Sequence, residues 1–296
     1  MNKIKIFIDS TGDLPKDLRD EYDIDYCPMI VTIDDKEIIA SLDYDQGYTL
    51  QQFYDVMRGG KRIFTSQVPA PTFVEKFTKA LDEGYDVLYI GCSNKLSASV
   101  LTAQKIVAEL APKYPNNKIV AFDSLIACLG QGLMAIEASK RRKEGMTFDE
   151  IVAWLEANKN RFNQFATVPT LSYLKQAGRV SATSAFFGNI FGVKPILISD
   201  CIGQNLAVEK VKGTKNSLLY CAKATVEAGE DLTGKTIYIG HADDVKAAEF
   251  VRDEILKLAP GVKTYIGPIG PIVGASTGPG TIGVYVFGKE VTVNRQ

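Results

Sequence analysis

The sequence predicts an α/β fold in two domains. Strand-like apolar runs alternate with helical apolar patterns, which is the order of a parallel sheet with helical crossovers. The 296 residues suffice for two ordinary domains, and 46% of them are hydrophobic, enough for a large core. Short polar segments follow several strands, where open α/β sheets bind ligands. We place the domains at 1–160 and 161–296, divided in the charged, Asn-rich stretch 156–163.

Composition excludes several classes of protein. The formal net charge of -1 offers no footprint for nucleic acid, and no apolar stretch approaches the length of a membrane span. The start lacks the apolar region of a signal peptide. The 5 cysteines are scattered without CxxC spacing, which favours reduced thiols in a cytoplasmic protein over a disulfide framework. His241 is the sole histidine, so we expect no metal centre built on several histidines.

The first third of the chain reads as a strand, a helix, a hairpin and a second helix. The strand at 3–9 leads to a helix beginning near Pro15, where proline suits the first turn. A second strand at 24–33 contains Pro28, which makes it edge-like or bulged. After a hairpin turn, Thr49 caps the next helix.

The segment Thr65-Ser66-Gln67 is held extended by the prolines that follow it. Helices and strands then alternate regularly, with helices at 72–83, 96–111 and 126–143 and strands at 86–91 and 118–122. Three strand ends carry hydroxyls, namely Ser10-Thr11, Ser93 and Ser124. Because carboxyl ends of parallel strands share one edge of a sheet, we expect these hydroxyls to gather there.

Beyond the boundary, a strand at 164–170 precedes a short helix stopped by Gly178. The later elements are strands at 194–199, 205–211, 235–240, 262–266 and 281–287, with helices at 214–229 and 243–258. We interpret the Gly- and Pro-rich stretch 267–280 as a tight loop whose backbone approaches another surface.

The stretch Tyr89–Ser99 reads as strand, tight turn and helix, with Ser93 in the turn. Backbone N–H groups and hydroxyls at a helix N-terminus favour an anion. The alternative is a plain serine cap. Arg179 likewise suits either an anion site or an ordinary surface position.

The sequence gives weaker support for other kinds of chemistry. Residues 274–283 are glycine-rich but lack the order of a nucleotide loop. Cys92 and Ser93 lack the GxSxG context of a nucleophile. Three aspartates at strand ends suit acid–base or Mg²⁺ chemistry, or simple capping: Asp9, Asp13 and Asp123.

Taken in order along almost the whole chain, eight segments resemble the DegV family, the acyl-binding (FakB-type) subunits of bacterial fatty acid kinase. They are Ile8–Pro15, Thr65–Gln67, Ser93–Ser99, Asp123-Ser124, Tyr173–Val180, Lys194–Gly203, His241–Asp244 and Gly267–Gly280. The resemblance implies a DegV-like fold, with a parallel N-terminal sheet, a mixed C-terminal sheet and one long-chain fatty acid between the domains. It implies no cofactor and no catalysis by this chain.

The resemblance also implies site residues. Hydroxyls of Thr65 and Ser93, with Ser66 and Ser97, would hold the fatty acid carboxylate. The acyl chain would be lined by Phe186, Phe187, Ile190, Phe191 and Ile196. Head-group or partner contacts would come from Arg179, Ser276 and Thr277. The expected partner is a separate ATP-dependent kinase that phosphorylates the carboxylate, and transient membrane contact fits the same role.

Two departures from the family pattern matter. Ser97-Ala98-Ser99 stands where Ser-Gly-Thr is usual, and Ser276 stands where the family has a histidine, which removes a cation near the carboxylate. The alternative function is a small-molecule phosphotransferase or nucleotide-binding enzyme using the 274–283 loop.

Overall fold

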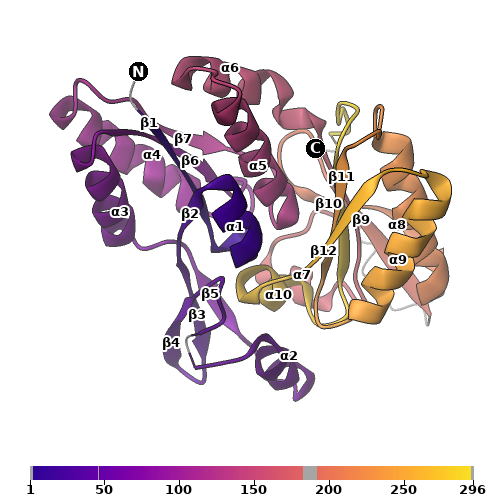
Figure 1. Cartoon of the computed structure of the whole chain (residues 1–296). Helices are drawn as coiled ribbons and strands as arrows, with labels where there is room; N and C mark the ends of the chain where they lie inside the picture. Colours follow the sequence, from indigo (N-terminus) through magenta and orange to yellow (C-terminus); the bar gives the residue numbers. More distant parts are fainter. Residues whose placement is uncertain (1–2, 46, 183–191, 295–296) are drawn as a thin grey trace.

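The computed structural model describes residues 3–45, 47–182 and 192–294, and three β-sheets form within these ranges (Figure 1). The first sheet is wholly parallel, which confirms the predicted N-terminal architecture. Its strand order is β2-β1-β6-β7, with β1 (Lys3–Asp9), β2 (Ile24–Cys27), β6 (Tyr85–Gly91) and β7 (Ile119–Asp123).

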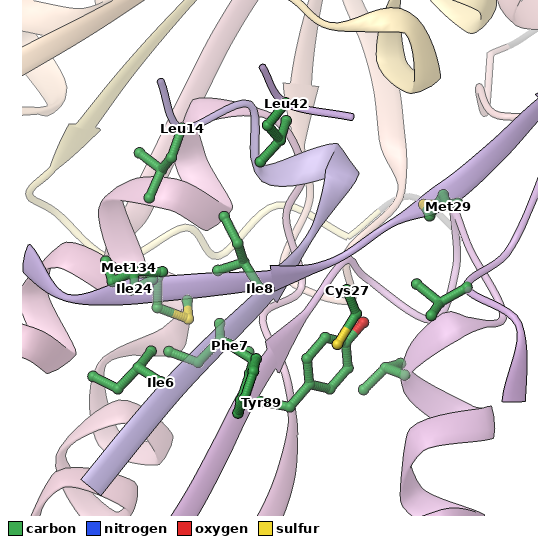
Figure 2. Packing of buried hydrophobic residues seen from close by; sticks show 14 of the residues in the cluster. Ile6, Phe7, Ile8, Leu14, Ile24, Cys27, Met29, Leu42, Tyr89 and Met134 are labelled. Atoms are coloured by element: carbon green, nitrogen blue, oxygen red, sulfur yellow. The ribbon is translucent and has the colours of Figure 1, made fainter. Parts of the chain in front are cut away.

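Helices and a large apolar core surround this sheet. The helices are α1 (Lys16–Tyr22), α3 (Ala70–Asp82), α4 (Ser99–Leu110), α5 (Leu129–Lys143) and α6 (Phe148–Asn158). Apolar side chains from the strands fill the space between the first sheet and these helices, as Figure 2 shows for Ile6, Phe7 and Ile8 of β1. The β6 side chains after Tyr85 are all buried, because helices cover both faces of a parallel sheet.

A small antiparallel sheet departs from the expected pattern. It has the order β4-β3-β5, with β3 (Met29–Ile33), β4 (Lys36–Ala40) and β5 (Phe64–Ser66), and α2 (Leu50–Arg58) lies beside it. The predicted strand at 24–33 is divided at Pro28, so that its two halves enter different sheets. Proline has no N–H for a ladder, which makes it a natural point of division. This branching places β5 next to the carboxyl edge of the first sheet.

The third sheet is mixed, as predicted for the C-terminal half. Its strand order is β10-β9-β8-β13-β11-β12, and only β11 and β12 pair in parallel. The strands are β8 (Phe162–Thr167), β9 (Val193–Ser199), β10 (Asn205–Lys212), β11 (Thr236–His241), β12 (Lys263–Pro268) and β13 (Ile282–Phe287). Helices α8 (Thr214–Ala228) and α9 (Val245–Leu258) cover one face, while α5 packs between this sheet and the first (Figure 1). The boundary at residue 160 stays a prediction.

Two short helices lie between the small sheet and the third sheet (Figure 1). α7 (Ser172–Ala177) ends at Gly178, as predicted. α10 (Pro271–Thr277) corrects the loop expected over 267–280. It forms despite its glycines because tertiary contacts hold it: Tyr54 Oη donates to the Ile269 carbonyl at 2.7 Å, and Gly274 leaves room for that ring.

Three short 3₁₀ segments complete the described structure, at Ser10–Gly12, Ala111–Lys113 and Lys159–Arg161. Within the described ranges, every helix is too short or too polar to cross a bilayer.

Candidate functional site

A cavity of about 240 Å³ opens where β1 and β6 end, beside β5, α7 and α10. We call it the strand-end cavity. Its polar lining consists of Thr11, Thr65, Ser66, Gln67, Ser97, Arg179, Asn205, Ser276 and Thr277. The rest of the lining is apolar apart from a thiol, with Met29, Cys92, Leu96, Ala98, Ala127, Leu174, Ile272 and Val273. A wall that combines hydroxyl donors and a guanidinium with apolar side chains suits a ligand with one anionic end.

The fold brings most of the predicted head-group residues into this cavity. Six of them line it, although they come from β5, the turn before α4, the end of α7 and α10: Thr65, Ser66, Ser97, Arg179, Ser276 and Thr277. No two of these elements are adjacent in sequence.

Three of the lining hydroxyls are free to bind a ligand. Thr65, Ser66 and Ser276 form no side-chain hydrogen bond with any other part of the chain that the structure describes. Thr277 differs, because its hydroxyl donates to the Val273 carbonyl at 3.0 Å, one turn earlier in α10.

Ser97 belongs to a short relay of hydroxyls. The Ser99 N–H donates to Ser97 Oγ at 3.2 Å, and the two serine oxygens lie 3.0 Å apart. Ser99 Oγ also accepts from the Val68 N–H at 3.1 Å. When the Ser99 hydroxyl donates to Ser97, the proton of Ser97 is left to point into the cavity.

Arg179 supplies a cation to the cavity. Its Nε–H donates to the Leu96 carbonyl at 2.9 Å, and an Nη1–H donates to the Ala177 carbonyl. A guanidinium has five N–H donors, so others remain for a ligand. The strand-end cavity therefore has a positive charge as well as the Ser276 hydroxyl.

Ser93 lies apart from these donors. It is 0% exposed, and its hydroxyl donates to the Gly203 carbonyl at 2.8 Å in the turn between β9 and β10. It does not line the cavity. Nor is it a helix cap, because α4 begins at Ser99 with Ala98 in the cap position. Its assignment to the carboxylate stays a prediction.

Asp9 anchors the floor of the cavity. Its carboxylate accepts hydrogen bonds from the Thr11 N–H at 2.9 Å, from Tyr89 Oη at 2.6 Å and from the Cys92 N–H at 3.1 Å. The Thr11 hydroxyl bonds to the same carboxylate. Four donors offset the burial of this carboxylate, so Asp9 holds the two strand ends together. This agrees with the capping alternative for that residue.

Asp13 lies beneath the start of α10. Its carboxyl accepts from the Gly270 N–H at 2.9 Å and contacts Cys128 Sγ at 3.0 Å. Burial raises the pKa of Asp13 to about 8, because water cannot solvate the charge. Asp13 therefore positions the helix that carries Ser276 without reaching the cavity itself.

The predicted acyl lining is placed only in part. Phe186, Phe187, Ile190 and Phe191 lie outside the described residues. Ile196 is 0% exposed and belongs to the apolar cluster between the third sheet and α8, rather than to the strand-end cavity.

Sequence reasoning missed several residues of the cavity. The Gly- and Pro-rich surroundings of Ile272 and Val273 predict a loop, and Asn205 opens β10 with no signal around it. For Thr11 the sequence offers one usable signal, its place as a hydroxyl at the end of a strand.

The alternative chemistries lack the geometry they need. Backbone N–H groups of the glycine-rich stretch are engaged: Gly274 donates to Gly270, Gly278 to Gly274 and Gly280 to Ala242. Burial raises the pKa of the Cys92 thiol, which disfavours a thiolate nucleophile. Within the described part of the chain, no cluster of three potential metal ligands occurs.

The model of a family described as "Uncharacterised protein, DegV family" matches residues 3–289. A DegV domain-containing protein of Clostridium perfringens is 36% identical over 288 residues, covering 97% of this chain and 98% of that protein.

Two solved structures are similar over nearly their full length. A DegV family protein from Thermus thermophilus, described by its fatty acid binding, has 28% identity and a TM-score of 0.85, covering 97% of this chain and 100% of that one. A DegV lipid binding protein from Thermotoga maritima has 26% identity and a TM-score of 0.85, covering 98% and 100%.

Proposed function

The chain belongs to the DegV family, and we propose that it binds a long-chain fatty acid whose carboxylate lies in the strand-end cavity. The observation that carries this proposal is the set of free hydroxyls that lies beside one guanidinium in a partly apolar wall. The binding described for the relatives from Thermus thermophilus and Thermotoga maritima supports it.

The carboxylate would be held by Thr65, Ser66 and Ser97, with Arg179 and Ser276 on the opposite side of the head group. A carboxylate removed from water needs several donors to offset its desolvation. Neutral hydroxyls stabilise it without neutralising it, which leaves an oxygen nucleophilic.

The acyl chain would supply most of the affinity. Each buried CH₂ contributes about 0.8 kcal/mol, so a tail of about 15 methylenes contributes on the order of 12 kcal/mol before the costs of association. We propose that the tail runs between the domains predicted at 1–160 and 161–296, toward the predicted lining at 186–191 and Ile196.

We further propose that the protein presents its ligand to a separate ATP-dependent kinase, without catalysis of its own. In that step a carboxylate oxygen bonds to the γ-phosphorus of ATP, the bond from this phosphorus to the β,γ-bridging oxygen breaks, and ADP leaves. Arg179 keeps a cation beside the reacting oxygen although Ser276 replaces the histidine. The unpaired cysteines fit a cytoplasmic setting.

The direct test is the identity of the bound molecule. Protein purified from cells should release a long-chain fatty acid on denaturation, detected by mass spectrometry, and native spectra should carry the same added mass. Protein that arrives empty and takes up no fatty acid from detergent-free solution would refute the proposal. Calorimetry with Mg-ATP on the isolated protein should detect no binding.

A further inference from the structure

Helix α10 forms one wall of the strand-end cavity. It supplies Ile272, Val273, Ser276 and Thr277 to the lining. The helix has only 7 residues, and no side chain caps its N-terminus. Because a helix of this length is unstable by itself in water, contacts with the rest of the protein must hold it in place.

Three hydrogen bonds fix the start of α10. Tyr54 Oη donates to the Ile269 carbonyl at 2.7 Å, and the Ile269 N–H donates to the His241 carbonyl at 2.8 Å. The Gly270 N–H donates to Asp13 Oδ1 at 2.9 Å. Two of these acceptors are backbone carbonyls, whereas the third belongs to a carboxyl that gains and loses a proton. The position of α10 therefore depends on one titratable acceptor.

Asp13 is 1% exposed and forms no ion pair within the ranges that the structure describes. Cys128 Sγ lies 3.0 Å from its Oδ2. The titratable groups around it come from β1, α2, the turn before α2, the residue before α5, and β13: Asp9, Tyr54, Tyr44, Cys128 and Tyr285. None of these groups is a cation, and Arg19 on α1 pairs with Asp43 instead.

A protonated Asp13 is satisfied where it lies. Oδ1 accepts from the Gly270 N–H, and Oδ2 shares a hydrogen bond with Cys128 Sγ. An ionised carboxylate in the same place would lack both water and a counter-charge, which is costly. The start of α10 itself covers the carboxyl, because a Cβ on Gly270 would lie 2.5 Å from Oδ1. Ionisation therefore favours a form in which α10 has moved away.

We propose that Asp13 is a proton-dependent positioning residue for α10. With its proton it holds α10 closed over the carboxylate of the bound fatty acid, and its ionisation lets α10 open and release the ligand. This inference rests on the proposed function and adds control by pH. Burial raises the pKa of Asp13 to about 8, which brings the change close to neutral pH.

The direction of the pH effect follows from the two positions of α10. In the closed form the pKa of Asp13 is about 8, whereas water in the open form returns it toward its ordinary value of 3.8. Between these two values the open form binds one proton fewer than the closed form. Each pH unit in this range therefore raises the open fraction by up to about tenfold, and the rise ends above about pH 8.

The test measures how fast a fluorescent long-chain fatty acid leaves the loaded protein between pH 6 and pH 9. An excess of unlabelled fatty acid prevents rebinding, so the rate reports the open fraction even when that fraction is small. The test variant is Asp13→Asn, which keeps an acceptor for the Gly270 N–H and does not titrate. The control is Asp86→Asn, which alters another buried carboxyl, near the start of β6 and outside the strand-end cavity.

We expect release from the wild type to accelerate about tenfold from pH 6 to pH 7 and less than about twofold from pH 8 to pH 9. Release from Asp13→Asn should change little with pH and should be slower than release from the wild type at pH 8. Asp86→Asn should keep the wild-type profile.

Tyr54→Phe gives a second, independent measurement. It removes the other side-chain contact at the start of α10 without removing a group that titrates in this range. Release should therefore be faster than in the wild type at every pH, with the same dependence on pH.

A wild-type rate that does not change with pH, or an Asp13→Asn profile as steep as that of the wild type, would overturn the inference. Unchanged release from Tyr54→Phe would also overturn it, because α10 would then not control the ligand. Wild-type protein that takes up no fatty acid at any pH would instead refute the proposed function itself.

Discussion

Two neighbouring segments carry the predicted carboxylate donors, and they use their hydroxyls in opposite ways. From the end of β6 to the first residue of α4, Ser93 donates to the Gly203 carbonyl, and Ser99 accepts from the Val68 N–H. In β5, the hydroxyls of Thr65 and Ser66 have no partner within the described structure. Ser93 and Ser99 thus hold parts of the fold together, whereas Thr65 and Ser66, like Ser97 in the first segment, are available to a ligand.

Burial explains the difference. Ser93 is fully buried, so a hydroxyl without a partner would cost about 1–3 kcal/mol there. Thr65 is half-buried and Ser66 exposed, so water can satisfy both until a ligand displaces it. A donor for a ligand must remain satisfied when the ligand is absent, and that favours the more accessible segment.

The largest effect on stability should come from Asp13, in the turn after β1. Its carboxyl, like the hydroxyl of Ser93, has partners within the protein. The folded-state pKa is about 8 against an unfolded value near 3.8, so the folded protein keeps a proton that the unfolded chain releases. The contribution of this group to the free energy of unfolding should therefore fall as pH rises from about 4 to 8, by several kcal/mol.

Urea unfolding of wild type and Asp13→Asn across this range measures the effect, because the variant cannot titrate there. The free energy of unfolding of the wild type, relative to that of the variant, should fall with rising pH, because only the wild type loses the proton of Asp13. A pH-independent difference would mean that Asp13 is already ionised in the folded protein.

Gly203→Ala tests the contact between Ser93 and Gly203 by changing the glycine. Gly203 has φ +85°, and a Cβ there would overlap the Ser93 hydroxyl. We expect a loss of about 2–4 kcal/mol in unfolding free energy. Gly261→Ala is the matched control, with φ +94° and nothing within 4 Å, and should cost only about 1 kcal/mol. Equal losses at both sites would show that the contact with Ser93 is unimportant.

Ser93→Ala tests whether the Ser93 hydroxyl stabilises the fold or binds the ligand carboxylate. The variant leaves the Gly203 carbonyl and the Lys95 N–H without their partner, so stability should drop by about 1–3 kcal/mol. Fatty acid affinity should change less than it does in the β5 variant below. A large loss of affinity at unchanged stability would restore Ser93 as a carboxylate contact.

Thr65→Val should give the smallest change in stability, within about 0.5 kcal/mol, because its hydroxyl bonds to no described residue. Its fatty acid affinity should fall about tenfold, through loss of one hydrogen bond to a charged group. Calorimetry and thermal unfolding on the same preparation test both statements. Unchanged affinity would move the carboxylate away from β5.

The order of elements was largely readable from the chain. Apolar periodicity located the strands and helices, and glycine at 178 marked the end of α7. Two predictions were wrong, because contacts between distant segments decide the structure there. The strand at 24–33 branches between two sheets, and α10 forms in a Gly- and Pro-rich stretch because Tyr54 and Asp13 hold its start.

The residues of the strand-end cavity also fall into two groups, those that the sequence predicts and those that it does not. Thr65, Ser66, Ser97, Arg179 and Ser276 could be named from motifs, and the fold gathers them in one cavity. Ile272, Val273 and Asn205 could not, because nothing local distinguishes an apolar or amide side chain that faces a ligand from one that faces the core.

By itself the sequence determined the alternation of strands and helices, the hydroxyls at their ends and the family. Those features depend on local propensity and on residue identity, which are written along the chain. Only the tertiary structure decided which hydroxyls are free. The partner of Ser93 is the carbonyl of Gly203, a long way along the chain and in another sheet's turn, whereas β5 meets no such acceptor within the described residues. Availability of a donor depends on what packs against it, and that is settled only when distant segments meet.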